Sequence, residues 1–294
     1  MKTILTAVCA TFVATAATAA DQCAAGKTLE DGVLTIATGN PAWFPWVIDD
    51  TPESGKGFEA AVAYAVANSM GFSDDAVKWV RTSFDEAIQP GAKNFDINLQ
   101  QFSITPEREE MVDFSEPYYT SAMAVLTTKK VAEGLESPGI DALKVYQQDR
   151  MRKDGEGIES PAIDALKGLI WGVMAGTTGH KMVEEIIAPD NAVLLYTENV
   201  DVTQAIQAGQ VEASLFDLPT ALYLSAAVVE DGVLLAQFPA DRSENPDQFG
   251  FLMQKGNPLK ECVDEALAEL KASGRLAEIE AEWLAGATGV PVIE

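Results

Sequence analysis

The sequence contains little histidine, little cysteine and few basic residues. Among 294 residues there are one histidine and three cysteines, which excludes a multi-histidine metal site and a cysteine-rich zinc module. Lysine and arginine number 20 against 45 aspartates and glutamates, so the net charge is −25. A surface of that charge attracts neither nucleic acid nor anionic membranes. We therefore expect no metal, no cofactor and no nucleic-acid partner.

Long hydrophobic runs are also missing. Beyond the N-terminus, no uncharged run reaches the length of about 18 residues that a membrane-spanning helix needs. The chain is nevertheless 47% hydrophobic and only 22% charged, which excludes a disordered chain. At about 150 residues per domain, the length favours two domains.

The N-terminus has the pattern of a secretory signal peptide. A positive start at Lys2, an apolar stretch over 3–13 and an alanine-rich stretch over 14–20 follow one another, in the order that such signals share. A buried N-terminal helix is the alternative. We expect cleavage at the end of the alanine-rich stretch, so that residues 1–20 are removed and the mature protein is periplasmic.

Two cysteines remain in the mature chain, because Cys9 leaves with the signal peptide. Cysteines in an oxidising compartment often pair, and we hypothesise a disulfide between Cys23 and Cys262 that ties the N-terminal tail to a C-terminal helix. Two unpaired thiols are the alternative. Lipid attachment at Cys23 is not expected, since the residues before it do not form a lipobox.

Segments typical of strands and helices alternate along the chain. The apolar periodicity predicts strands at 33–38, 77–80, 95–99, 123–127, 170–174, 193–196, 213–216 and 249–253, and helices at 58–70, 84–88, 178–187, 202–208, 219–228 and, in two pieces, 258–283. Such alternation indicates α/β layers around mainly parallel sheets. One series lies before about residue 125 and another after it, which predicts two lobes.

One segment is duplicated. Residues 136–144 recur almost unchanged at 159–167, and the stretch between the copies is highly polar. A single copy is not a solenoid. We interpret residues 136–158 as a tandem duplication of a surface linker; a functional docking loop is the alternative.

An arginine follows one predicted strand end. In the segment 102–108, Thr105 is suited to cap a short helix that begins at Pro106. This would place Ser103 and Arg108 at the carboxyl end of a strand, where α/β sheets bind ligands. An arginine there can bind a carboxylate through two parallel hydrogen bonds. The alternative is an exposed arginine that pairs with a neighbouring glutamate.

A second strand end, at 173–181, carries Gly176, Thr177 and Thr178 before a helix. Backbone N–H groups and hydroxyls at a helix N-terminus suit an anion, although the segment is not a P-loop. Ordinary strand-to-helix turn chemistry is the alternative.

Two further segments complete the set. Asp217 stands at a strand end before Pro219 and could accept an ammonium group or simply cap a helix. Trp43 lies in an aromatic loop after the first strand, suited to a pocket wall or to core packing. An arginine, an anion cradle, a carboxylate and an aromatic wall together match a zwitterion.

These features resemble the family 3 extracellular solute-binding proteins, the amino-acid-binding proteins of bacterial ABC importers. The resemblance covers nearly the whole mature chain, and its motifs are specific together although each is weak alone. They are Gly57-Phe58-Glu59, Phe95-Asp96-Ile97, 103–108, 112–119, 172–173, 175–179, 209–213, 217–219 and 255–259.

The resemblance implies a type II periplasmic-binding-protein fold, with a mainly parallel sheet flanked by helices in each lobe. Residues 21–120 plus 246–294 would form lobe 1 and residues 121–245 lobe 2, with two hinge crossings near 120–122 and 243–247. The C-terminal helices would return to lobe 1, which would bring Cys262 within reach of Cys23.

The resemblance also implies roles for site residues. Arg108 would hold the α-carboxylate with Ser103, Thr177 and Thr178; Asp217 and the backbone carbonyl of Gln101 would receive the α-ammonium; Trp43 would line the side-chain pocket, flanked by Asn40 and Met174. Family members that take basic amino acids often carry an acid where Asn40 stands, so a polar or neutral amino acid is favoured. Opine-like and sulfur-containing zwitterions are alternatives.

The implied function is capture of an amino acid by a monomer whose lobes close, followed by delivery to an ABC permease. We do not expect the protein to be an enzyme. A periplasmic dehydratase or lyase on the same fold is the first alternative, and a sensory ligand-binding module is the second.

Overall fold

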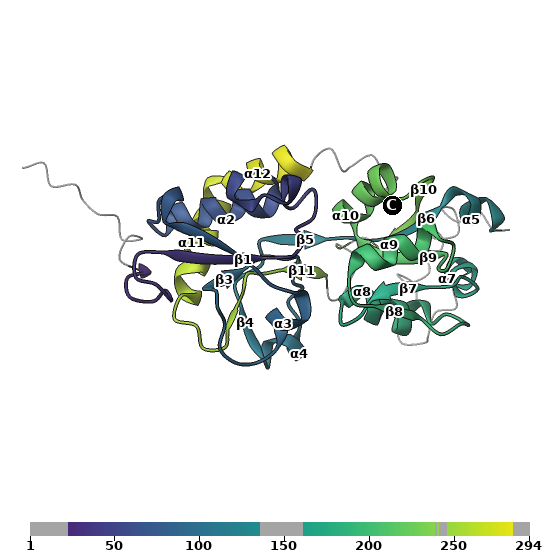
Figure 1. The fold of residues 1–294 in the computed structure, drawn as a ribbon, viewed down its shortest axis with the longest axis horizontal. Helices are drawn as coiled ribbons and strands as arrows, with labels where there is room; N and C mark the ends of the chain where they lie inside the picture. The colour runs from purple at the N-terminus through teal and green to yellow at the C-terminus, as the bar shows by residue number, and fades with distance from the viewer. Residues whose placement is uncertain (1–22, 136–160, 239, 241–245, 285–294) are drawn as a thin grey trace, which may run out of the picture.

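The computed structural model describes residues 23–135, 161–238, 240 and 246–284. The predicted signal peptide (1–20) and the duplicated segment (136–158) therefore lie outside the described residues. Figure 1 shows two lobes side by side along the longest axis of the molecule, joined by a pair of strands. Within the described ranges, none of the helices is long and apolar enough to cross a membrane.

The first lobe is built on a five-stranded sheet with the order β2-β1-β3-β12-β4. Its strands are β1 (Leu34–Thr38), β2 (Val77–Arg81), β3 (Ile97–Asn98), β4 (Val112–Phe114) and β12 (Leu252–Gln254). β1 is parallel to β2 and β3, whereas β12 is antiparallel to β3 and β4. β1 is buried along its whole length, including Thr35 and Thr38, as is typical of a central strand covered by helices on both faces.

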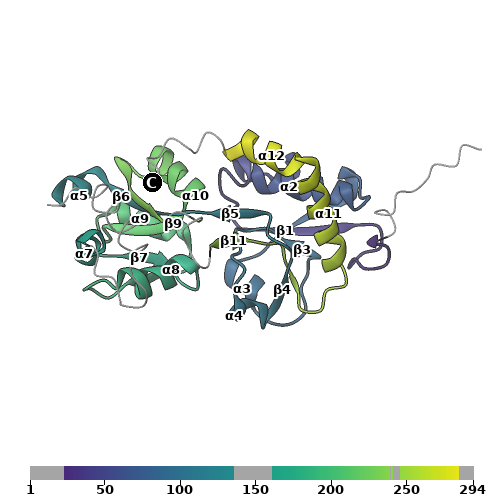
Figure 2. The same ribbon diagram turned by 180° about the vertical axis from the view of Figure 1, so that it is seen from behind.

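Helices cover both faces of this sheet. Those on one face are α2 (Phe58–Ser69), α11 (Lys260–Ser273) and α12 (Arg275–Leu284), and those on the other are α3 (Phe84–Ile88) and α4 (Pro106–Glu109), as Figures 1 and 2 show from opposite sides. Short 3-10 segments η1 (Ile48–Asp50), η2 (Pro52–Ser54) and η3 (Asp74–Ala76) lie in the connections. Phe58, Val62 and Val66 of α2 are fully buried in one core with α11 and α12, and each such side chain contributes about 1.5–3 kcal/mol. The C-terminal helices therefore belong to the first lobe.

The second lobe contains a three-stranded sheet, β10-β6-β9, and the pair β7-β8. Its strands are β6 (Met123–Thr128), β7 (Gly172–Met174), β8 (Leu194–Tyr196), β9 (Ala213–Asp217) and β10 (Gly232–Phe238). Its helices are α5 (Lys129–Gly134), α7 (Pro161–Lys167), α8 (Thr178–Met182), α9 (Asn199–Gln207) and α10 (Leu218–Tyr223), with π-helical turns η4 (Val183–Ile187) and η5 (Leu224–Val228). Val125, Trp171 and Leu215 lie in a core that is separate from that of the first lobe.

The two-lobed α/β architecture and the two crossings between lobes are confirmed, and the described strands of each lobe run mainly parallel. In the second lobe β9 and β10 run the same way, since both are antiparallel to β6, and β7, which pairs in parallel with β8, lies parallel to β9 through the bridge from Trp171 to Ala213. Among these strands β6 alone runs the other way. The chain enters this lobe through β6 and leaves it through β10. Two strands that lead in and out through the same side must run in opposite directions when they lie next to each other.

Two antiparallel strands, β5 (Tyr119–Ser121) and β11 (Asp247–Phe249), join the lobes. The single strand predicted at 249–253 is therefore wrong, because its residues are divided between β11 and β12, which belong to different sheets. Gly250 lies between these strands, where an added Cβ would come within 2.9 Å of the Ile104 side chain. The apolar patterns also missed β4, β5 and β10.

A disulfide joins Cys23 to Cys262, with their Cα atoms 5.7 Å apart. Cys262 is on the buried face of α11, so the bond holds the first described residues against a core helix. The two cysteines are 239 positions apart in the sequence. The alternative of two unpaired thiols does not hold in this structure.

The variant Cys23→Ser/Cys262→Ala should lose about 2–4 kcal/mol of unfolding free energy, since a cross-link over a long loop chiefly restricts the unfolded chain. Urea unfolding followed by tryptophan fluorescence measures this loss. Dithiothreitol should destabilise the wild type and leave the variant unchanged. Equal unfolding midpoints for the two proteins would contradict a stabilising bridge.

Candidate ligand-binding site

A cavity lies between the two lobes, next to the strands that join them. About 80 Å³ of it can hold the centre of a water molecule, which is room for roughly five waters and therefore for a small ligand rather than a polymer. The residues that line it are Pro41, Trp43, Phe84, Gln100, Gln101, Ser103, Arg108, Asp247 and Phe249 from the first lobe and β11, and Met123, Met174, Thr177, Thr178, Gly179, Glu198, Asn199, Leu215, Phe216 and Asp217 from the second. Eight of the nine predicted ligand-binding residues are among them, and Asn40 is the exception.

Arg108 is held in the cavity wall by the short helix α4. Thr105 caps this helix by accepting a hydrogen bond from Arg108 N at 3.2 Å, and Pro106 takes its first position. This local geometry agrees with the prediction from the sequence. Arg108 is only 6% exposed, so it is not the exposed helix-start arginine of the alternative interpretation.

The guanidinium of Arg108 contacts both lobes. Nη1 donates to the carbonyl oxygen of Ser103 at 2.8 Å, and Nη2 donates to the carbonyl oxygen of Gly176 at 2.9 Å. Its central carbon lies 5.3 Å from the centre of the Phe84 ring. Burial lowers the pKa of Arg108 to about 10, so the group stays charged at neutral pH. A guanidinium has five N–H donors, and these two bonds leave others for a ligand carboxylate.

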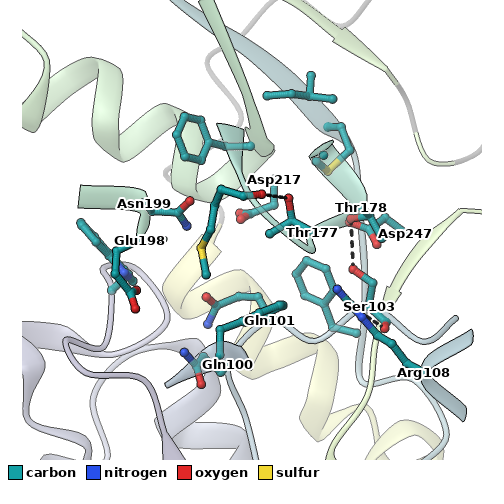
Figure 3. A pocket seen from close by; sticks show the side chains of 18 of the residues that line it. Gln100, Gln101, Ser103, Arg108, Thr177, Thr178, Glu198, Asn199, Asp217 and Asp247 are labelled. Carbon is teal, nitrogen blue, oxygen red and sulfur yellow. Dashed lines mark hydrogen bonds between the residues drawn. The ribbon is translucent and has the colours of Figure 1, made fainter. Parts of the chain in front are cut away.

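Thr177 and Thr178, at the start of α8, make different hydrogen bonds. The Thr177 hydroxyl accepts a hydrogen bond from His180 N at 3.1 Å and donates to the Met174 carbonyl at 2.8 Å. It therefore performs the turn chemistry that was the alternative interpretation. The Thr178 hydroxyl instead lies 3.2 Å from the Ser103 hydroxyl of the other lobe, as Figure 3 shows.

Asp217 both caps a helix and lines the cavity. It ends β9, and its Oδ1 accepts a hydrogen bond from Thr220 N at 2.9 Å at the start of α10. Burial raises the pKa of Asp217 to about 7, although the bonds from Thr220 oppose the shift, and the negative charge of Asp247 adds to it. The two interpretations of this residue, capping and ligand binding, are therefore compatible.

Sequence reasoning missed three polar residues of the lining, Asp247, Glu198 and Asn199. Glu198 and Asn199 follow β8, so the rule that ligands bind at strand carboxyl ends could have found them. Asp247 begins β11, inside the segment expected to form the second crossing. No local pattern shows that its carboxylate faces the cavity.

The aromatic loop after β1 contributes less than predicted. Trp43 lines the cavity, but Asn40 is exposed and does not. Pro41, although exposed, and Trp43 both line the cavity, whereas the neighbouring Asn40 does not. Trp46 is fully buried, and its Nε1 donates to Thr220 Oγ1 of the other lobe at 2.8 Å.

Gln101 is held in place by hydrogen bonds to the buried carboxyl group of Glu59. Glu59 is 1% exposed and accepts hydrogen bonds from Gln101 N at 2.8 Å, from Gln101 Nε2 at 2.5 Å and from the Tyr118 hydroxyl. Gln101 has a left-handed backbone, with φ of 51°, which the bonds to Glu59 stabilise. Burial raises the pKa of Glu59 to about 7, although these hydrogen bonds oppose the shift.

The family model of the bacterial extracellular solute-binding proteins, family 3, matches residues 34–286. The chain belongs to this family. A probable amino-acid ABC transporter periplasmic-binding protein of Sinorhizobium fredii is 27% identical, over 88% of this chain and 80% of its own length. The L-cystine-binding protein TcyJ of Escherichia coli is 28% identical, over 90% and 87%.

Other relatives show how wide the family is. Cyclohexadienyl dehydratase of Pseudomonas aeruginosa is 25% identical to this chain, over 94% of it and 91% of the enzyme. Among solved structures, an ancestral arginine-binding protein bound to glutamine superimposes with a TM-score of 0.63 at 24% identity, covering 86% of this chain and 98% of that protein. The family fold is therefore shared by binding proteins and by an enzyme.

The ionisation of Glu59 should make folding stability depend on pH. Because burial raises its pKa from 4.5 to about 7, the folded protein holds this proton more tightly than the unfolded chain does. Its contribution to the unfolding free energy is therefore fully present below about pH 4.5 and is lost as the pH rises to about 7. The loss is of the order of 3 kcal/mol.

Urea unfolding between pH 4.5 and 8 measures this effect in the wild type and in Glu59→Gln, which lacks the titrating group. The difference in unfolding free energy between the two proteins should change across this range and level off above about pH 7.5. Asp217 titrates in both proteins, so its own contribution cancels in the difference apart from its repulsion of the Glu59 charge, which adds to the raised pKa of Glu59. Unfolding free energies that change with pH in the same way in the two proteins would contradict the raised pKa of Glu59.

Proposed function

We propose that this protein captures an amino acid between its two lobes and delivers it to an ABC permease. The observation that carries the proposal is that Arg108, from the first lobe, and Asp217, from the second, line the same cavity. A cation and an anion on opposite walls suit the α-carboxylate and α-ammonium of a zwitterion. Relatives of similar length that are named as amino-acid-binding proteins support this proposal.

In this proposal the lobes act as a clamp. Closure removes the charges of ligand and protein from water, which is unfavourable unless each charge finds a partner. A ligand therefore shifts the balance between open and closed forms by its better fit to the closed form. The pair β5 and β11 would act as the hinge, and the permease would recognise the closed form. Export of a monomer by the signal peptide at 1–20 belongs to the same proposal.

Removal of either proposed charge partner should weaken amino-acid binding. Arg108→Ala and Asp217→Asn should each lose about 2–5 kcal/mol of binding free energy, because truncation leaves the opposite ligand charge buried without a partner. Asparagine is also a good helix cap, so the second variant keeps α10 intact. A thermal-shift screen of the twenty amino acids finds the ligand, and titration calorimetry measures the affinities.

Arg275→Ala is the matched control. Arg275 is an exposed arginine on α12, paired with Glu278, and its loss should leave the affinity unchanged. Wild-type affinity in both cleft variants would refute the assignment of the site.

We further propose that this chain binds its ligand without converting it. A general acid or base must reach the reacting atom. Glu59 lies behind Gln101, and His180, whose Nε2 is 3.2 Å from Glu184, is not part of the cavity lining. The lining carboxyl whose pKa burial raises to about 7, Asp217, is assigned in this proposal to the ammonium of the ligand. The relative named as a dehydratase makes an enzyme the specific alternative.

Incubation with excess ligand should return that ligand unchanged. NMR spectra recorded over a day, with the bound amino acid and with a cyclohexadienyl acid, test this directly. Product that accumulates beyond one equivalent of protein would show catalysis. Loss of that product in Asp217→Asn would then assign it to the cleft.

A further inference from the structure

A buried tryptophan of the first lobe reaches the second lobe. Trp46 lies in the loop between β1 and α2, and its Nε1 donates a hydrogen bond to Thr220 Oγ1 of α10 at 2.8 Å. Trp46 is fully buried and Thr220 is 3% exposed. Neither residue is among those that line the cavity. Any effect of this bond on a ligand therefore acts through a neighbour that does line it.

The first lobe and the strands that join the lobes fix the position of Trp46. Its backbone carbonyl accepts hydrogen bonds from Glu59 N at 3.0 Å and from Ala60 N at 3.3 Å, at the start of α2. The centre of its ring lies 5.5 Å from that of Tyr119 in β5 and 5.7 Å from that of Phe249 in β11. Separation of the lobes would therefore carry the indole N–H away from α10.

Thr220 connects this bond to a carboxyl group of the cavity. Its backbone N donates to Asp217 Oδ1 at 2.9 Å, and its side chain also hydrogen-bonds to the same carboxyl group. A hydroxyl has one hydrogen and two lone pairs. While Thr220 Oγ1 accepts the indole N–H of Trp46, its hydrogen is available for Asp217, and hydrogen bonds in such a chain strengthen one another. The chain of bonds leads from the first lobe to Asp217 in the second.

The same loop and the same helix also meet at a more exposed point. The rings of Phe44 and Tyr223 have centres 4.7 Å apart, and Phe44 is 43% exposed. Neither ring lines the cavity. A fully buried indole N–H is unfavourable without an acceptor, whereas partly exposed rings need no particular partner. Of these two contacts, the hydrogen bond from Trp46 therefore depends more on how the lobes close.

We propose that Trp46 and Thr220 form a latch, which stabilises the closed lobes and orients Asp217 toward the ammonium group of the bound amino acid. Both are positioning residues, because they act through Asp217 and do not touch the ligand. The inference rests on the proposed function, since it assumes that Asp217 receives an ammonium group. It adds the protein contact that transmits lobe closure to this carboxylate.

Two substitutions of Thr220 test the latch. Thr220→Val keeps the shape of the side chain but removes the hydroxyl, and it leaves the buried indole N–H without an acceptor. Binding should become about five- to twentyfold weaker. Thr220→Ser keeps the hydroxyl and should bind within about threefold of the wild type. Titration calorimetry measures both, with whichever of the twenty standard amino acids raises the wild-type melting temperature most.

A double-mutant cycle tests whether the two residues act together. Trp46→Phe keeps an aromatic ring against Tyr119 and Phe249 but lacks the N–H donor, so it should also weaken binding about five- to twentyfold. If Trp46 acts through Thr220, the double variant Trp46→Phe/Thr220→Val should bind at least about threefold tighter than the product of the two single effects predicts.

Trp79→Phe is the matched control. The Nε1 of Trp79 donates to the Tyr64 hydroxyl at 3.3 Å, and both residues belong to the first lobe. This variant also loses an indole hydrogen bond, but one that does not cross the cleft, so its affinity should equal that of the wild type. The melting temperature of each variant without amino acid checks its fold. Should Trp46→Phe fail to fold, the comparison of Thr220→Val with Thr220→Ser decides the matter.

Binding kinetics distinguish a latch from a residue that merely supports the fold. The bond forms after the amino acid has entered, so Thr220→Val should dissociate faster by about the factor lost in affinity, with little change in the association rate. Stopped-flow displacement by a second amino acid measures the dissociation rate. Weaker binding that comes from slower association alone overturns the latch.

The outcomes separate this inference from the function on which it rests. Wild-type affinity in Thr220→Val, equal losses in Thr220→Val and Thr220→Ser, or additive effects in the cycle overturn the latch and leave amino-acid capture standing. Absence of binding of all twenty amino acids to the wild type refutes the proposed function itself.

Discussion

The organisation of this protein depends on one constraint: charges that are buried between two lobes must be compensated there. Arg108 illustrates it most clearly, because a guanidinium that is 6% exposed would be strongly unfavourable without partners. It finds them in carbonyl groups on both sides of the cleft, Ser103 on one lobe and Gly176 on the other. The site is therefore complete only when the lobes are together.

The fold meets this constraint by placing strand ends around one cavity. Trp43 follows β1, Gln101 and Ser103 follow β3, Thr178 follows β7, and Asp217 ends β9. In α/β sheets the carboxyl ends of strands are open, because the following loops turn into helices there. Two such sheets that face each other surround a small molecule with polar groups from both sides. The paired strands β5 and β11 connect the two lobes.

The contacts between the lobes that involve only protein groups are both polar and apolar. Besides the bond from Arg108 to Gly176, the polar ones include the hydroxyl pair of Ser103 and Thr178 and the bond from Trp46 to Thr220. The apolar ones include the rings of Phe44 and Tyr223, whose centres are 4.7 Å apart. Each such bond replaces one with water, so its net contribution is about 0.5–1.5 kcal/mol. In the proposed function, a ligand that pairs with the buried charges adds to these bonds, so that closure depends on the ligand.

The sequence by itself determined the local structure, and eight of the nine residues that it singled out line one cavity. Thr105 and Asp217 cap the helices that their neighbours predict, because capping depends only on residues within one turn. The two lobes follow from the alternation of apolar patterns. Only the tertiary structure decided the antiparallel pairing of β6 with β9 and β10, the outward position of Asn40, the bonds from Gln101 to Glu59, and the approach of Asp247 to Thr178. Most of these contacts join segments that are 40 or more residues apart, and how a short loop turns depends on the fold around it. Burial, which sets the energetic cost of each charge, is a property of the assembled lobes rather than of any segment.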